Sequence, residues 1–125
     1  MADLPEAWNA KYQDSLGIVP PTDADGVLQD VHWSAGLIGY FPTYSLGNLY
    51  ASQFYDAAEA QLGDLKAMFA AGDFGPLKGW LNENIHAPGQ RWSSTELGAK
   101  VTGEGLSHDR LIKHFKEKLD PIYQL

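Results

Sequence analysis

Apolar residues along this chain recur mostly at spacings of three and four, which is the pattern of amphipathic helices. The first such stripe consists of Leu4, Trp8, Tyr12 and Leu16. Pro5 suits the first turn of a helix and Gly17 suits its end. Pro20 and Pro21 then forbid helix. We therefore expect one helix over residues 4–16, followed by a loop.

Residues 22–62 are expected to hold a short helix and, after an irregular stretch, the longest apolar stripe of the chain. Thr22 and Asp25 resemble a capping box, so a short helix is expected to begin near Thr22 and to carry residues 29–33. Gly36, Gly39 and Pro42 interrupt regular structure. A long helix is predicted from Thr43 to Leu62, and its apolar face consists of Leu46, Leu49, Tyr50, Phe54, Ala57, Ala58 and Leu62.

The C-terminal half predicts four further helices. They are expected over 64–71, over 76–85, from Ser93 to just before Gly103, and after Ser107. Ser93 and Glu96 have capping-box spacing, and Ser107 is the expected cap of the last helix. The inward residues are predicted to be Leu77, Trp80 and Leu81 in the second of these helices and Leu111, Ile112, Phe115 and Leu119 in the last. Strand signals are weak, so the predicted class is all-α. Seven helical segments are marked in all, some of them short, and the predicted architecture is a small bundle of five to six helices in one domain over residues 1–125.

Composition limits the possible partners. The 125 residues carry only nine Lys and Arg and a formal net charge of −7, which disfavours nucleic acid because phosphate would be repelled. No apolar run approaches the roughly 18 residues of a membrane span. The chain has no cysteine, which excludes disulfides and thiolate metal sites and fits a reducing compartment. A cytoplasmic protein without a membrane partner is expected.

Residues 26–48 hold the main candidates for chemistry. His32 could donate a hydrogen bond to a bound anion or an oxyanion, or could be a packed histidine that a backbone carbonyl satisfies. Asp30 precedes it by two residues, and within one helix these side chains would not face each other, so a direct Asp–His pair is not expected. Tyr40 and Tyr44 are one helical turn apart. Their hydroxyls could stabilise negative charge or could be the polar tips of core residues.

Other polar residues favour structural interpretations. Gln29 and Asp30 could position a ligand, although capping of local backbone is favoured. Arg91 is expected to pair with an acidic neighbour, and His86 to lie at a helix C-terminus, where its charge is favourable. His108 and His114 are expected at the surface, six residues apart. No His-Glu-x-x-His motif, phosphate-binding loop or nucleophile elbow occurs, so no metal site or self-sufficient catalytic set is expected in this chain.

The segment GVLQDVHW at 26–33 resembles the G-x-x-Q-D-x-H-W signature of the thermostable metallocarboxypeptidases of the carboxypeptidase Taq family. The following GYFPTY, the stretches IHAPGQRWSSTEL and TGEGL, and the C-terminal residues 111–125 are also similar to that family. The resemblance covers essentially the whole chain. It implies a C-terminal piece, about one quarter, of a larger helical enzyme whose zinc ion is held by residues that precede this region.

The resemblance also implies roles for individual residues. His32 resembles a histidine that faces the substrate groove, and Tyr44, or else Tyr40, resembles the tyrosine that stabilises the tetrahedral oxyanion. Gln29, Asp30 and Trp33 would line the substrate-binding wall beside them. His32 and Tyr44 are accordingly expected to project into one concavity.

Two functions are therefore expected from the sequence. The first is the substrate-groove portion of a zinc metallocarboxypeptidase that acts on peptide C-termini and is inactive as an isolated chain. The second is a non-catalytic helical module derived from that fold, with an exposed aromatic patch around Trp33, Tyr40, Phe41 and Tyr44 that supports binding or self-association.

Overall fold

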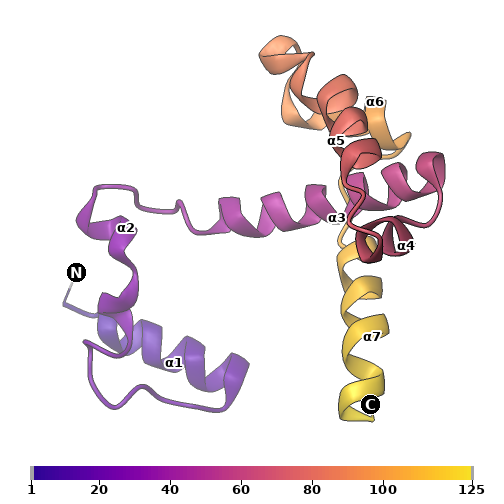
Figure 1. Ribbon diagram of the computed structural model, residues 1–125. Coiled ribbons are helices and arrows are strands. Elements are labelled where there is room, and N and C mark those ends of the chain that lie inside the picture. The colour runs from indigo at the N-terminus through magenta and orange to yellow at the C-terminus, as the bar shows by residue number, and fades with distance from the viewer. Residues whose placement is uncertain (1, 125) are drawn as a thin grey trace. The chain divides into compact units, whose positions relative to one another are not determined.

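The computed structural model describes residues 2–124, and all regular structure in that range is helical (Figure 1). The α-helices are α1 (Leu4–Leu16), α2 (Val31–Ser34), α3 (Pro42–Leu62), α4 (Leu65–Ala70), α5 (Gly75–Leu81), α6 (Ser94–Thr102) and α7 (Asp109–Tyr123). This confirms the all-α prediction, with seven α-helices in the described range where five to six were expected. The chain divides into two compact units, Met1–Pro42 and Thr43–Leu125, which are described in turn. That the chain acts as one domain stays a prediction.

In the first unit, α1 begins and ends where the sequence indicates. Pro5 occupies the first turn, where its missing N–H has no intrahelical partner to lose. Gly17 ends the helix with φ 71°, a left-handed conformation that a residue with a side chain adopts only at a cost.

The helix expected to begin near Thr22 and to carry residues 29–33 is only partly confirmed, because its helical part is α2 and no helix begins at Thr22. Thr22 and Asp25 do bond reciprocally, with Thr22 Oγ1 donating to Asp25 Oδ2 at 2.7 Å. They form only a turn, which leads into a short 3₁₀ segment (Val27–Gln29) and then α2. Gly26 and Asp30 both leave helical geometry, at φ −115°, ψ −112° and φ −78°, ψ 94° respectively. A Cβ at Gly26 would lie 3.1 Å from Pro20 Cβ, so this close approach of the chain favours glycine.

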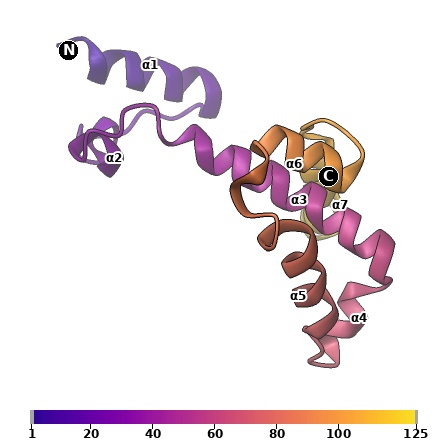
Figure 2. The same cartoon turned by 90° about the horizontal axis from the view of Figure 1, so that it is seen from above.

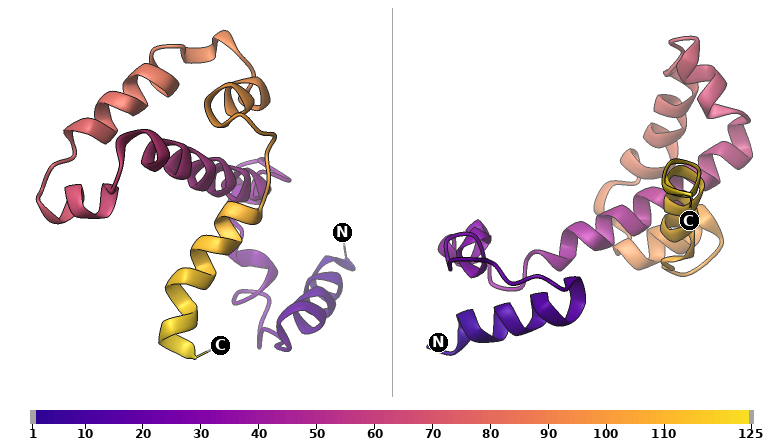
Figure 3. Two further views of the ribbon diagram at one scale, coloured as in Figure 1. Left: turned by 90° about the vertical axis from the view of Figure 1, so that its right-hand side faces the viewer. Right: turned by 90° about the horizontal axis from the view of Figure 1, so that it is seen from below.

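The second unit has a small core where α3, α4, α5 and α6 meet. Ala58, Leu65 and Trp80 are its buried centre, and Phe54, Leu62, Leu77, Leu81 and Val101 are among the half-buried side chains that pack against it. This confirms the inward prediction for 76–85. After the turn made by α4, α5 folds back over α3 (Figures 2 and 3). The Trp80 indole N–H donates to Gln61 Oε1 at 2.9 Å, which satisfies the polar atom of this large buried ring.

The connection after α5 is irregular but still helical. A π-helical turn (Asn82–His86) follows α5 directly, and a 3₁₀ segment (Gly89–Arg91) precedes α6. The predicted capping box of α6 is present, because Ser93 accepts from the Glu96 N–H and Glu96 accepts from the Ser93 N–H and hydroxyl. Gly103 ends α6 with φ 77°.

The last helix differs from its prediction in two respects. Ser107 lies one residue before the N-cap position, although its Oγ still accepts from the Asp109 N–H at 3.1 Å. The expected buried face is wrong, because Ile112 and Phe115 are 43% and 45% exposed, while Leu111 and Leu119 are half-buried. The helix is amphipathic in sequence, but the described residues leave much of its apolar face uncovered.

Candidate functional site

The centre of the first unit is a carboxylate–imidazole pair. Asp30 is the N-cap of α2, and its Oδ1 accepts from the His32 backbone N–H at 2.9 Å. The same Oδ1 lies 2.7 Å from His32 Nδ1. The side chains of Asp30 and His32 are only 8% and 16% exposed. The expectation that these two residues do not pair is therefore wrong. It assumed that both lie within one helix, whereas the extended backbone of Asp30 turns its carboxylate back over the first turn.

The pairing fixes which nitrogen of His32 carries a hydrogen. A carboxylate only accepts, so Nδ1 must be protonated to donate to Asp30 Oδ1. The neutral imidazole then has its lone pair on Nε2, and the imidazolium has an N–H there. His32 held in this way can accept a hydrogen bond at Nε2 when neutral and can donate one there when charged. The partner of Nδ1 is thus a side chain and not the backbone carbonyl that the packed-histidine interpretation invoked.

Aromatic rings from the segment before α3 enclose His32. Tyr40 stacks on the imidazole with ring centroids 5.1 Å apart and planes at 27°. Phe41 meets it edge-on at 5.3 Å and 76°. Gly36 and Gly39, at φ 76° and 79°, provide the left-handed turns that return the chain to this position. The structure therefore brings His32, Asp30 and Tyr40 together.

The other predicted residues are described one by one. Gln29 is exposed and its amide donates to the Ala24 carbonyl, which agrees with the backbone-capping interpretation. Trp33 is half-buried and meets Trp8 edge-on at 6.0 Å. Tyr44 lies in the first turn of α3 and belongs to the second unit. That His32 and Tyr44 share one concavity stays a prediction.

The second unit holds a polar network that the sequence did not reveal. Gln53 on α3 is 3% exposed, and its Nε2 donates to the Gly105 carbonyl at 3.0 Å and to Glu104 Oε1 at 3.2 Å. Its Oε1 accepts from the Ser107 N–H at 3.2 Å. Arg110 Nε adds a bond to Glu104 Oε1 at 3.3 Å. A lone glutamine on an apolar stripe was the available signal, and it indicates a polar group that must find partners inside the fold.

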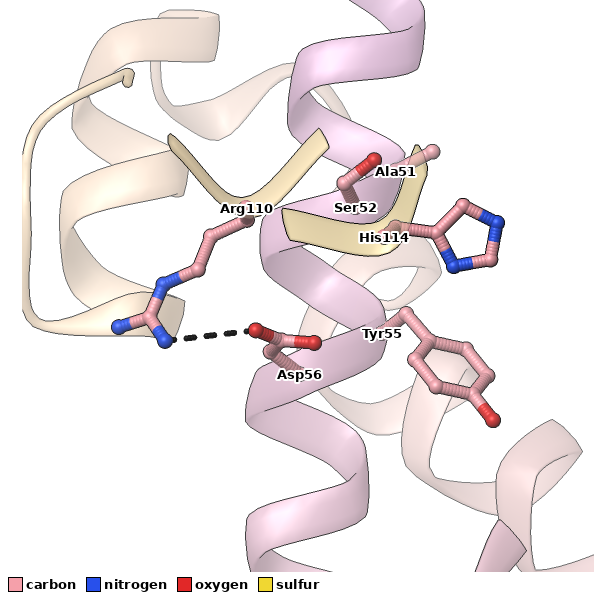
Figure 4. A pocket seen from close by; sticks show the side chains of 6 residues that line it. All are labelled: Ala51, Ser52, Tyr55, Asp56, Arg110 and His114. Atoms are coloured by element: carbon pink, nitrogen blue, oxygen red, sulfur yellow. Dashed lines mark hydrogen bonds and ion pairs between the residues drawn. The ribbon is translucent and has the colours of Figure 1, made fainter. Parts of the chain in front are cut away.

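A hollow of about 230 Å³ lies beside this network, between α3 and α7 (Figure 4). Arg110 pairs with Asp56 at 3.4 Å on one side, while Tyr55 and His114 lie on the other. Partial burial raises the pKa of Tyr55 above its usual 10.0, and the nearby carboxylates of Glu59, Asp64 and Asp56 raise it further. Arg110 already contacts two carboxylates, so its charge is not available to an anion in the hollow.

The other titratable residues have structural surroundings. His86 lies at the end of the π-helical turn, as expected. Arg91 places its guanidinium 5.3 Å from the Trp92 ring centroid, and Lys100 approaches the same ring at 4.9 Å. The expected acidic partner of Arg91 is therefore wrong, because the described residues give it an aromatic face instead. His108 and His114 are exposed, as predicted.

Residues 2–124 do not bring together the donors that a metal ion needs. No three His, Asp or Glu side chains in this range lie close enough to share an ion. In the Asp30–His32 pair the hydrogen on Nδ1 leaves only Nε2 of the ring to bind a metal, and the described residues place no third His, Asp or Glu beside the pair, so it does not complete a zinc site. Within the same range, no helix has both the length and the apolar character that crossing a bilayer requires.

Comparisons with known proteins place the chain in a family of metallopeptidases. The family model for carboxypeptidase Taq (M32) metallopeptidases matches residues 1–119. The chain belongs to this family, which confirms the resemblance seen in GVLQDVHW and GYFPTY.

Relatives match nearly the whole chain. Thermostable carboxypeptidase 1 of Thermus thermophilus is 50% identical over 121 residues, which are 97% of this chain and 24% of that protein. Carboxypeptidase 1 of Bacillus subtilis is 45% identical over 98% of this chain and 25% of its own length. The crystal structure of an M32 carboxypeptidase from Deinococcus radiodurans R1 matches 99% of this chain and 25% of its own, at 44% identity and a TM-score of 0.93. The chain thus spans about a quarter of the length of these relatives and matches part of a larger helical fold.

Proposed function

We propose that this chain forms part of the substrate-groove wall of a zinc metallocarboxypeptidase, which releases C-terminal residues from peptides. The observation that carries the proposal is the imidazole of His32, fixed by the Asp30 carboxylate and enclosed by Tyr40 and Phe41. The match to the M32 family supports the assignment of this cluster to a peptidase.

The orientation of His32 determines the chemistry that we assign to it. With Nδ1–H directed at Asp30, the imidazolium presents a single N–H at Nε2. Such a donor can stabilise negative charge that develops on a peptide carbonyl oxygen, and the hydroxyl of Tyr40 or Tyr44 is proposed as a second donor. We propose that the wall beside the substrate consists of Gln29, Asp30 and Trp33, and that Asp30 acts on the substrate through His32.

The metal and the general base are proposed to lie on residues other than those of this chain, and we derive no step through the metal. The isolated chain is then expected not to hydrolyse peptides. The lack of cysteine is consistent with a cytoplasmic location, which we propose together with the peptidase role.

The experiment is reconstitution. The portion of Bacillus subtilis carboxypeptidase 1 that this chain does not match would be coexpressed with the chain, and complex formation would be checked by copurification. We expect chelator-sensitive release of C-terminal amino acids from the complex and none from the chain alone. His32→Ala in the complex is expected to lower kcat about 10²-fold, as for one lost oxyanion donor. A complex that forms but releases no amino acid, or a chain that hydrolyses peptides alone, would contradict the proposal.

A second function rests on the exposed apolar residues of the first unit. Val31 and Ile38 are 71% and 76% exposed, and Phe41 and Leu28 are also largely exposed. Such surface commonly marks association sites, so a non-catalytic binding or self-associating module is the alternative. Concentration-dependent dimers in sedimentation, combined with an inactive reconstituted complex, would favour this function over the first.

A further inference from the structure

The first unit contains an aromatic hollow of about 530 Å³ near the Asp30–His32 pair. Its walls include Trp8, Tyr12, Trp33 and Phe41. Trp8 stacks on Tyr12 with centroids 5.1 Å apart and meets Trp33 edge-on at 6.0 Å. The volume is in the range of small-molecule sites, and the walls present several π faces from two separate parts of the unit.

One wall of this hollow carries a buried negative charge. Asp30 lines it, and both hydrogen bonds that the described residues direct at this carboxylate end on Oδ1. Oδ2 therefore accepts no hydrogen bond within residues 2–124, and the basic group beside the carboxylate, the His32 imidazole, contacts Oδ1. A carboxylate this buried gains from a positive partner, because little water screens the interaction.

The charges around the hollow favour a cation over an anion. The first unit holds the acidic residues Asp3, Glu6, Asp14, Asp23, Asp25 and Asp30 and a single basic residue of fixed charge, Lys11. Lys11 pairs with Asp14 at 3.1 Å and not with Asp30. The other basic side chain beside the carboxylate is His32, so with a neutral imidazole the described part of the first unit gives Asp30 no positively charged partner and leaves that place to a ligand.

We propose that this hollow binds a guanidinium or ammonium group carried on an alkyl chain, the chemistry of an arginine or lysine side chain. The cation would lie against the faces of Trp8 and Trp33 with Asp30 Oδ2 as its counter-ion, and its methylene groups would cover apolar surface. A purely apolar ligand would leave Oδ2 buried and unpaired, and an anion would be repelled. The proposal does not depend on peptidase activity, because the site is complete within the first unit.

The test uses the full 125-residue chain and two isosteric probes. Binding of N-acetyl-arginine amide and of its neutral analogue N-acetyl-citrulline amide would be measured by calorimetry at low salt above neutral pH. The indole signals of Trp8 and Trp33 would be followed by NMR. We expect the arginine probe to bind at least about tenfold more tightly than the citrulline probe. Ethylguanidinium is a further probe. If it binds as tightly as N-acetyl-arginine amide, the hollow recognises the guanidinium group alone.

Variants test whether the aromatic wall itself, and not the folding of the chain in general, accounts for binding. Trp8→Leu removes a π face and is expected to weaken arginine binding about tenfold, whereas Trp8→Phe keeps a face and should change it less than about threefold. Trp92→Leu, in the second unit, is the matched control and should leave binding unchanged. Circular dichroism checks folding, and Tyr12→Leu replaces Trp8→Leu if that variant unfolds. Equal binding of arginine and citrulline probes, or no shift of either indole up to the solubility limit, would overturn the proposal.

Discussion

Gln53 offers the sharpest test of what holds the second unit together. Replacement by leucine keeps the volume near that of glutamine but removes all three of its hydrogen bonds, leaving the Gly105 carbonyl and the Ser107 N–H without partners. An unsatisfied buried polar group costs about 1–3 kcal/mol, and the loop is partly exposed, so we take about 1 kcal/mol for each. The expected loss is about 2 kcal/mol, or about 10 °C in Tm for a unit of this size.

Urea unfolding followed by tryptophan fluorescence measures this loss, and hydrogen exchange of the Ser107 amide locates it. We expect that amide to exchange faster in Gln53→Leu, with the urea m-value unchanged. Gln90→Leu is the control, because Gln90 is exposed and makes no side-chain hydrogen bond within the described range. A loss below about 0.5 kcal/mol with unchanged Ser107 exchange would show that Gln53 does not anchor the loop.

Three further predictions concern helix packing and capping. Gly98→Ala should lower the free energy of unfolding by about 1–3 kcal/mol, because the new Cβ would lie 2.8 Å from the Tyr50 ring of α3. Gly79→Ala is the matched control, because its Cβ would meet nothing within 4 Å, and it should raise the free energy of unfolding by about 0.5–1 kcal/mol. Thermal unfolding measures both changes. Hydrogen bonds from Ser93 hold the pKa of Glu96 below its usual 4.5, so the contribution of Glu96 to stability is complete above that pH and is lost as pH falls through the lowered pKa. Stability measured against pH should therefore fall in acid for the wild type and less so for Glu96→Gln. Coincident curves for the two proteins would refute this. Asp30→Asn should convert His32 from the Nδ1–H tautomer to a mixture, visible as averaged ¹⁵N shifts of the neutral ring, and unchanged shifts would contradict the assigned role of the carboxylate.

Local signals in the sequence predicted most of the helices. Pro5, Gly17 and Gly103 mark helix ends, and the Ser93–Glu96 box starts α6 as expected. These features act over one or two turns, so the sequence contains all the information that they need. The start of a helix near Thr22 was predicted wrongly because Thr22 caps a turn as readily as a helix, and because the close approach of Pro20 to Gly26 is not visible in spacing.

The candidate site was only partly predictable. Asp30 and His32 were both identified, but their pairing was not expected, because residues two positions apart in a helix point to different faces. The pairing depends on the φ and ψ of one residue, which spacing does not determine. Gln53 was missed because its partners lie more than fifty positions away in the chain. Residue identity was thus recoverable from sequence, whereas contacts formed through an irregular turn or over long separation were not.

The shared acceptor Asp30 Oδ1 couples two properties that are usually independent. The same oxygen begins α2 and sets the protonation pattern of the imidazole, so a substitution that removes it changes the ring and loosens the turn that carries it at the same time. Redesign of His32 chemistry would therefore have to keep a capping oxygen at residue 30, as asparagine does, and natural variants without one should carry a compensating change in the same turn.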